Sequence, residues 1–231
     1  MKHNVWMSVS DLMTGLMVIF LFVAISYIRK VQESQTVLTD YVETKNSLHD
    51  KLVKEFEGDS QRWQMSVGKD LSMRFNNPQV LFASGKADLT PEFQQILDEF
   101  LPKYFNILLN DSLRSKIQEI RIEGHTDNVP APHLDPDAYI ANVILSQQRS
   151  LSVLRYFRAM PDFATYSDNE KKLLEYWFTA NGLSYGKSVD RDGNYTIKTN
   201  QPIDKERSRR VEFRIVTSGE EVLENFVKEL K

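Results

Sequence analysis

The chain has 231 residues, with 29 Lys and Arg against 32 Asp and Glu and a formal net charge of -3 at pH 7. This balance argues against nucleic-acid binding through bulk positive charge, and the length allows one ordinary domain with an additional segment. The absence of cysteine excludes disulfides, thiolate metal sites and a cysteine nucleophile. Because the four histidines are scattered, we expect neither a metal centre nor a cofactor.

The first element is an apolar segment near the N-terminus. No charged residue occurs in 12–28, and extension back to Val5 adds a single ionisable group, Asp11. About 20 apolar residues in a helix cross the hydrocarbon core of a bilayer. The sequence therefore predicts a short leader and one membrane-spanning helix in residues 1–30. A cleaved signal peptide ending near Ala24 is the alternative, but a tryptophan and an acid ahead of the apolar run fit it poorly.

Asp11 is the candidate functional residue of this segment. A carboxylate within a membrane span costs about 2.5 to 3.5 kcal/mol on insertion scales and by default marks a functional site. On a helix, Asp11, Thr14 and Gly15 share one face, which suits close packing against a partner or a narrow wet path. An apolar environment favours the protonated form of a carboxyl group, as an ion relay requires. The alternative is a solvated acid at the membrane edge, near the helix N-terminus.

Residues 31–57 contain no glycine or proline and place apolar side chains at nearly heptad spacing. We therefore expect a helical stalk or linker in residues 31–62, with a hinge at 58–60. The apolar stripe is narrow and broken. It is equally compatible with parallel pairing of two copies and with a solvated helix that continues the membrane span.

Residues 63–218 show the pattern of a compact α/β domain in which strands and helices alternate. Strands are predicted at 80–83, 117–123, 195–199 and 210–216, and helices at 91–109, 139–157 and 168–179. Thr90 before Pro91 and a capping box at Ser167 mark two helix starts. Residues 219–231 are expected to form a C-terminal helix.

Two short patterns suggest enzyme chemistry. The sequence Gly186-Lys187-Ser188 has the end of a phosphate-binding loop but lacks its upstream glycine and a preceding strand. His125 lies close to Asp127, yet no serine or cysteine elbow and no metal-ligand spacing surrounds it. We therefore expect no enzyme activity and interpret His125 as a structural residue of a turn.

Three ordered blocks in the domain resemble the signature of the OmpA-like peptidoglycan-binding domain. The blocks are Ile122-Glu123-Gly124-His125-Thr126-Asp127-Asn128, Asn142 with Leu145-Ser146-Gln147-Gln148-Arg149, and Ser208-Arg209-Arg210-Val211-Glu212-Phe213. The resemblance covers roughly residues 70–217. It implies an α/β (α+β) domain of β/α/β/α type with a mixed sheet, and a site for the diaminopimelate of the cell-wall peptide.

The chemistry of the matched residues agrees with such a ligand. Asp127 can pair with an ammonium group, and Arg149 can bind a carboxylate in a bidentate pair. Asn142 lies seven positions before Arg149, so both can face one pocket. By the same match, the pocket would also be lined or supported by Thr126, Asn128 and Leu145. The alternative for Asp127 and Arg149 is a buried ion pair that fixes the turn.

Two stretches depart from the OmpA-like pattern. One is a proline-rich insertion at 129–141, and the other is extra material between Arg158 and Arg209. Both are expected to reshape the mouth of the pocket, so the wall ligand binds either in the usual pose or only after a rearrangement.

The apolar segment carries a second resemblance, over roughly residues 6–28. Trp6, the stretch from Ser10 to Met17 and the sequence Phe20-Leu21-Phe22 resemble the B subunit of the MotA/MotB family of ion-driven stators. In that family the acid that matches Asp11 carries the translocated proton. The short leader and the enlarged wall domain look closer to the B subunit of the Zorya anti-phage defence system than to a flagellar stator.

This resemblance implies a position and a set of partners. Two copies would pair inside a ring of an A-type membrane subunit in the bacterial inner membrane, with the N-terminus cytoplasmic and the wall domain periplasmic. Cytoplasmic effector proteins would be reached through the A subunit, without direct contact of this chain with nucleic acid. A flagellar stator subunit is the alternative, and a further one is a passive tether that would not need Asp11.

Overall fold

The computed structural model describes residues 3–83 and 85–220, which form two compact units. The smaller unit holds the described residues up to Glu43 together with Gly219 and Glu220, and the larger unit holds Thr44 to Ser218. Beyond Glu220, the C-terminal helix expected from the sequence lies outside the described residues.

The smaller unit consists mainly of the N-terminal part of one helix, whose residues from Thr44 onward belong to the larger unit. Helix α1 runs from His3 to Phe56, so the predicted stalk is helical as far as that residue. Apolar side chains on all sides of its N-terminal part are exposed, with Leu12 at 73% and Met17 at 74%. A helix that is apolar all round matches a hydrocarbon environment better than water. As the sequence predicts, α1 is long and apolar enough to cross a bilayer.

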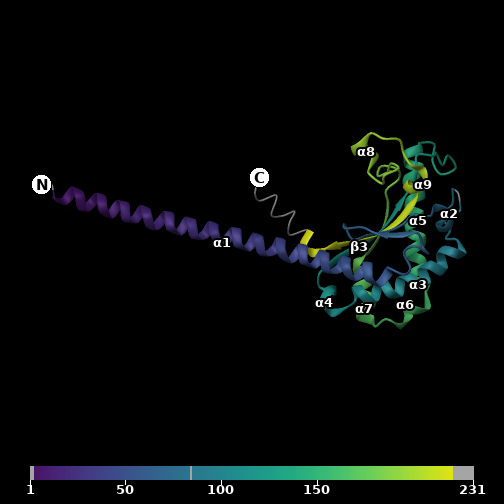
Figure 1. Ribbon diagram of the computed structural model, residues 1–231, viewed down its shortest axis with the longest axis horizontal. Coiled ribbons are helices and arrows are strands. Elements are labelled where there is room, and N and C mark those ends of the chain that lie inside the picture. Colours follow the sequence, from purple (N-terminus) through teal and green to yellow (C-terminus); the bar gives the residue numbers. More distant parts are fainter. Residues whose placement is uncertain (1–2, 84, 221–231) are drawn as a thin grey trace. The chain divides into compact units, whose positions relative to one another are not determined.

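The larger unit is built on a five-stranded mixed sheet (Figure 1). Its strands are β1 (Met65–Val67), β2 (Ser72–Phe75), β3 (Ile117–His125), β4 (Phe178–Gly182) and β5 (Arg210–Thr217). They lie in the order β1-β2-β5-β3-β4, in which β3 and β4 are parallel and all other neighbours are antiparallel. The mixed sheet confirms the predicted fold class.

Of the helices described in this unit, three (α3, α5 and α7) begin within one residue of the predicted starts, and the other five are short helices that the sequence does not predict. In chain order the helices are α2 (Pro78–Leu81), α3 (Pro91–Leu108), α4 (Asp111–Arg114), α5 (Ala138–Ala159), α6 (Pro161–Thr165), α7 (Asp168–Trp177), α8 (Thr196–Thr199) and α9 (Lys205–Ser208). The Thr90 hydroxyl caps α3 by accepting from the Phe93 amide at 3.1 Å, and Ser167 forms a capping box with Glu170 at α7.

Alternation along the strands gives the sheet one apolar and one charged face. Ile122 of β3 and Phe213 of β5 are fully buried, and the Phe213 ring lies 5.1 Å from that of Phe100 in α3. The residues between the apolar ones point to the opposite face because the side-chain period of a strand is two. They are Glu119, Arg121, Glu123 and His125 of β3, Arg210, Glu212 and Arg214 of β5, and Arg74 of β2. Helices α3 and α5 pack on the apolar face.

Three predicted elements differ from the structure. Residues 80–83 are not a strand, because the helical turn α2 begins at Pro78, a residue that suits the first turn, and only a bridge from Phe82 to Leu89 follows. The strand expected at 195–199 is the short helix α8. The helix expected to reach residue 179 ends at Trp177, and β4 begins at the next residue, Phe178.

Two glycines allow α5 to lie directly on the parallel strands. A Cβ atom at Gly124 of β3 would lie 2.3 Å from the Ser146 carbonyl oxygen, and one at Gly182 of β4 would lie 2.4 Å from the Gln147 amide nitrogen. Both neighbours are backbone atoms of α5, so neither can move aside as a flexible side chain would. The glycines therefore set the distance of α5 from the sheet, and with it the position of Arg149 on that helix.

We expect Gly124→Ala to lower the free energy of unfolding by about 1 to 3 kcal/mol, because the added methyl group overpacks the contact between α5 and β3. Thermal or chemical denaturation of the full chain in detergent measures this change. Gly58→Ala is the matched control, since a Cβ atom there has nothing within 4 Å. Equal stabilities of the two variants would contradict the close-packing argument.

Candidate functional site

A cavity of about 220 Å³ opens at the edge of the sheet where β3 ends and β5 begins. The lining residues are Gln79, Leu81, Phe82, Gly85, Arg149, Arg209 and Arg210. Three arginines come together here. Arg149 belongs to α5, whereas Arg209 and Arg210 lie at the start of β5, far from α5 in the chain. Guanidinium groups are forks of N–H donors that match carboxylates, so the lining favours a ligand with an anionic group.

Arg149 is held rigidly in the wall of this cavity. Only 6% of the residue is exposed, its Nε donates to the Lys86 carbonyl oxygen at 2.9 Å, and its guanidinium carbon lies 4.9 Å from the centre of the Phe82 ring. Burial lowers the pKa of Arg149 to about 10, against the opposing effect of Asp127 and with a further contribution from Arg209. The group is therefore still charged at neutral pH. Its two terminal nitrogens make no hydrogen bond to another described residue and remain available to a ligand.

Asp127 is not among the described residues that line the cavity, and it is bound to Arg209, not to Arg149 as in the ion pair considered from the sequence. Its Oδ2 accepts from Arg209 Nη1 at 2.9 Å, and its Oδ1 accepts from the Val129 amide at the same distance. The Asp127 side chain is 5% exposed and that of Arg209 is 34% exposed. The structure thus pairs Asp127 with Arg209, while Arg149 is held by the backbone.

Sequence reasoning missed Arg209 and Arg210 as residues of the site. Both belong to the third block of the OmpA-like resemblance, so the signal was present in the motif. What the motif does not show is that the first arginine of the pair meets Asp127 and the second lies on the charged face of the sheet.

The two polar neighbours of Asp127 lie differently. Thr126 is buried, its amide donates to the Ser184 carbonyl at 3.0 Å, and its hydroxyl has no partner among residues 3–83 and 85–220. Asn128 is exposed. Neither side chain is among the described residues that line the cavity, so their predicted binding role stays a prediction.

Asn142 and Leu145 support the proline-rich insertion. The Asn142 amide nitrogen donates to the carbonyl oxygens of Val129 and Ala138, at 3.0 Å each. Leu145 packs in a small apolar cluster with Ala131. Through its two hydrogen bonds, the Asn142 side chain connects the insertion to α5. Among the described residues, Arg149 lines the cavity and Asn142 does not.

Asp11 and Thr14 lie in the smaller unit, on α1. The Thr14 hydroxyl donates to the Ser10 carbonyl oxygen at 2.8 Å, one turn earlier in the same helix. Asp11 is exposed, and within the described ranges its carboxylate accepts no hydrogen bond. The relay role of these two residues stays a prediction.

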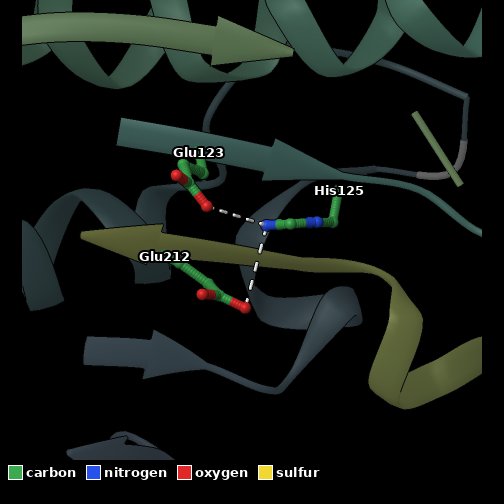
Figure 2. Close-up of side chains that lie close together, drawn as sticks. All are labelled: Glu123, His125 and Glu212. Carbon is green, nitrogen blue, oxygen red and sulfur yellow. Dashed lines mark ion pairs between the residues drawn. The ribbon is translucent and has the colours of Figure 1, made fainter. Parts of the chain in front are cut away.

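A buried polar cluster lies next to the cavity, on the charged face of the sheet (Figure 2). His125 Nε2 is 3.7 Å from Glu123 Oε2 and 3.7 Å from Glu212 Oε1. The same Glu212 oxygen accepts from Arg210 Nε at 2.6 Å and lies 3.2 Å from Arg74 Nε. Neither ring nitrogen of His125 has a hydrogen-bond partner among the described residues. His125 is 1% exposed and is the last residue of β3, whereas the sequence suggested a residue of a turn.

One histidine and two carboxylates whose ligand atoms lie within 4.8 Å of one another are a set that can hold a divalent cation. Two features argue against a resident cation. Two arginines already neutralise Glu212, and no side chain of the set is more than 5% exposed, so a cation would be desolvated beside two guanidinium groups. Burial lowers the pKa of His125 from its usual 6.5, and Arg210 acts in the same direction against the two carboxylates. The imidazole is therefore neutral at pH 7.

Comparison with known proteins agrees with the fold and with the sequence motifs. Residues 81–161 match the OmpA family. The chain is 36% identical to the Zorya protein ZorB of Escherichia coli (strain ATCC 8739), over 97% of this chain and 92% of that protein. The chain belongs to the ZorB family. The predicted resemblance to an OmpA-like domain and to the Zorya B subunit is confirmed.

Two further matches place this ZorB-family chain. A ZorB protein of Escherichia coli O139:H28 is 24% identical to it, over 93% of this chain and 80% of that protein. The crystal structure of a MotB-like protein from Desulfovibrio vulgaris superposes with a TM-score of 0.51 at 22% identity, covering 78% of this chain and 98% of that one. The last match shows that the two proteins share a fold.

The neutral, buried His125 makes stability depend on pH. The folded state binds the imidazole proton less readily than the unfolded state, so stability is present above a pH of about 6.5 and is lost as the pH falls through the folded pKa. We expect His125→Gln to flatten the stability curve between about pH 7 and pH 5, as measured by thermal denaturation at a series of pH values. His133→Gln, at an exposed position, should keep the wild-type slope. An equally steep curve for His125→Gln would contradict the assignment.

Proposed function

We propose that this ZorB-family chain is the B subunit of an ion-driven membrane complex that is anchored to peptidoglycan and acts in anti-phage defence. The observation that carries the proposal is the combination of two features in one chain. The apolar N-terminal part of α1, up to Ile28, contains a single carboxylate, Asp11, and an OmpA-family domain has a cavity lined by Arg149, Arg209 and Arg210. Membership of the ZorB family favours defence over a flagellar role.

The cavity offers the charges that a diaminopimelate side chain needs. That side chain ends in a carboxylate and an ammonium group on one carbon atom. The two unbonded nitrogens of Arg149 suit the carboxylate, and Asp127 suits the ammonium. Asp127 already accepts from Arg209, so the ammonium either shares the carboxylate with it or displaces it, and the partly exposed Arg209 can turn toward the anionic part of the ligand. No buried charge is left without a partner in this exchange.

We expect Arg149→Ala to weaken binding of the full chain, in detergent, to isolated sacculi by about tenfold or more, because a charge-assisted bidentate contact is lost. Sacculus pull-down over a range of protein concentrations measures the change. The control is Arg155→Ala, an exposed arginine on the same helix, for which binding should stay at the wild-type level. Unchanged binding of Arg149→Ala would remove the cavity from the wall-binding site.

The membrane half of the proposal concerns Asp11. With the N-terminus in the cytoplasm and the larger unit in the periplasm, α1 would cross the inner membrane beside a second copy and inside a ring of the A subunit. Protonation of Asp11 removes its charge and lets the ring move past it. A membrane potential supplies about 2.3 kcal/mol per charge per 100 mV, which is enough to bias repeated steps. Cytoplasmic effectors would receive the signal through the A subunit.

We expect Asp11→Asn to abolish phage protection in cells that carry the whole operon, while membrane insertion and complex assembly stay intact. Plating efficiency of phage measures protection, and co-purification of the A subunit measures assembly. Glu33→Gln, the same exchange of an acid for its amide farther along α1, should keep protection. Full protection by Asp11→Asn would overturn the relay and leave a passive tether, whereas loss of motility instead of protection would indicate a flagellar stator.

A further inference from the structure

A second and larger hollow lies on the charged face of the sheet. Its volume is about 770 Å³, and it is formed between the β1–β2 edge and residues 189–207, the part of the chain that departs from the OmpA-like pattern. Arg74 and Asn76 line it from the sheet, and Asn194, Tyr195, Lys198 and Arg207 line it from the other side. Figure 1 shows α8 and α9 in the upper part of the view, with α9 leading into the yellow strand β5. We call this hollow the β1–β2 cleft.

The outer wall of the β1–β2 cleft is an ordered structure. Asp190 is buried, and its Oδ1 accepts from the amides of Asp192 and Asn194 at 3.0 and 2.9 Å. Its Oδ2 accepts from the Thr199 hydroxyl at 2.9 Å, and the Val189 amide donates to the Ser208 hydroxyl at 3.0 Å. One buried carboxylate thus connects the turn with the end of the following helix, α8. The cleft is therefore preformed, which reduces the entropy lost when a ligand binds.

The lining of the cleft excludes two classes of ligand. Its cations are balanced by Asp70, Asp192 and Glu206, and two of them, Arg74 and Arg210, are already bound to the buried Glu212. A polyanion such as a nucleic acid would meet three carboxylates there. An apolar peptide would cover the charged and hydrogen-bonding side chains that make up most of the lining residues, and so leave them without partners.

The same lining suits a neutral ligand rich in hydroxyl and amide groups. Asn194, Tyr195 and Arg207 offer side-chain donors and acceptors that make no hydrogen bond to another described residue. The half-buried Tyr195 adds a flat apolar ring, with Lys198 Nζ 5.9 Å from its centre. A sugar ring has an apolar face of C–H groups and an equatorial rim of hydroxyls, so it needs both an aromatic surface and polar groups around it.

Arg210 connects the cleft with the arginine-lined cavity, because it lines both. It is 4% exposed and held on three sides, by Glu212 at 2.6 Å and by the carbonyl oxygens of Ser208 and Lys187 at 3.2 and 3.3 Å. A ligand in the cleft and a ligand in the cavity would therefore contact the same fixed side chain. The two sites fit two covalently joined parts of one ligand.

We propose that the β1–β2 cleft binds the glycan strand of peptidoglycan, the chain of N-acetylated sugars to which the stem peptides are attached. This rests on the proposed function, in which the stem peptide occupies the arginine-lined cavity. Tyr195 stacks on a sugar ring, and Asn76 and Asn194 bind its hydroxyl and acetamido groups. The segment 189–207 thereby adds a sugar subsite to the peptide subsite.

The experiment uses the full chain in detergent and two separate probes. One probe is glycan strands freed of peptide by an amidase, and the other is a synthetic stem tripeptide that contains diaminopimelate. The variants are Tyr195→Ala and Asn194→Ala in the cleft and Arg149→Ala in the cavity. The matched control is Tyr176→Ala, an exposed tyrosine on α7 that lines neither site. Thermal midpoints of all variants report whether each is folded.

We expect the wild-type chain and Tyr176→Ala to bind both probes. Tyr195→Ala should bind glycan strands about tenfold more weakly and the tripeptide equally well, and Arg149→Ala should show the reverse. Asn194→Ala, whose side chain is exposed, gives the same test if Tyr195→Ala fails to fold. Absence of glycan binding by the wild type, or wild-type glycan binding by a folded cleft variant, would overturn the proposal. Glycan binding without tripeptide binding would support the cleft and remove the cavity from the proposed function.

Discussion

The polar half of the domain depends on one buried carboxylate, that of Glu212. It bonds to the guanidinium groups of Arg210 and Arg74, and it lies directly opposite Glu123 across the β3–β5 pair. Without it, the buried Arg210 would lose its counter-charge, a defect that costs about 3 to 5 kcal/mol in proteins, whereas the half-buried Arg74 would keep its ion pair with Asp70 at 2.8 Å. Arg210 would also lose the contact that fixes it at the boundary between the cavity and the β1–β2 cleft.

The period of two along the strands separates stability from recognition. One face of β5 supplies Phe213 to the aromatic core, while the other supplies Arg210 and Glu212 to the buried polar cluster on the charged face. A shift of register by one residue would exchange these roles, so the apolar core also fixes the charged face. The glycines of β3 and β4 hold α5 against the same sheet, which is how Arg149 from a helix and Arg209 from a strand end meet in one cavity.

The parts of the fold that the sequence predicts are those with long periodic patterns or clear caps, such as α3, α5, β3 and β5. Strands β1, β2 and β4 have only 3, 4 and 5 residues, too few to show a period. In the site, Asp127 and Arg149 stand out by their motif. The ion pair of Asp127 with Arg209 joins positions 82 residues apart, and no local pattern contains that information. The β1–β2 cleft likewise depends on how residues 189–207 pack on the sheet.

The contact between Arg149 and the Lys86 carbonyl oxygen affects how this site can vary. Because the acceptor is a main-chain atom, the side chain at position 86 contributes nothing to it and is free to differ among relatives. The number of residues between Phe82 and Lys86 is constrained instead, since a deletion or insertion there would move both the carbonyl and the ring that face the guanidinium. Substitution should be tolerated at position 86, whereas it should not be at Phe82, whose ring faces the guanidinium, or at Gly85, whose φ of 68° favours glycine.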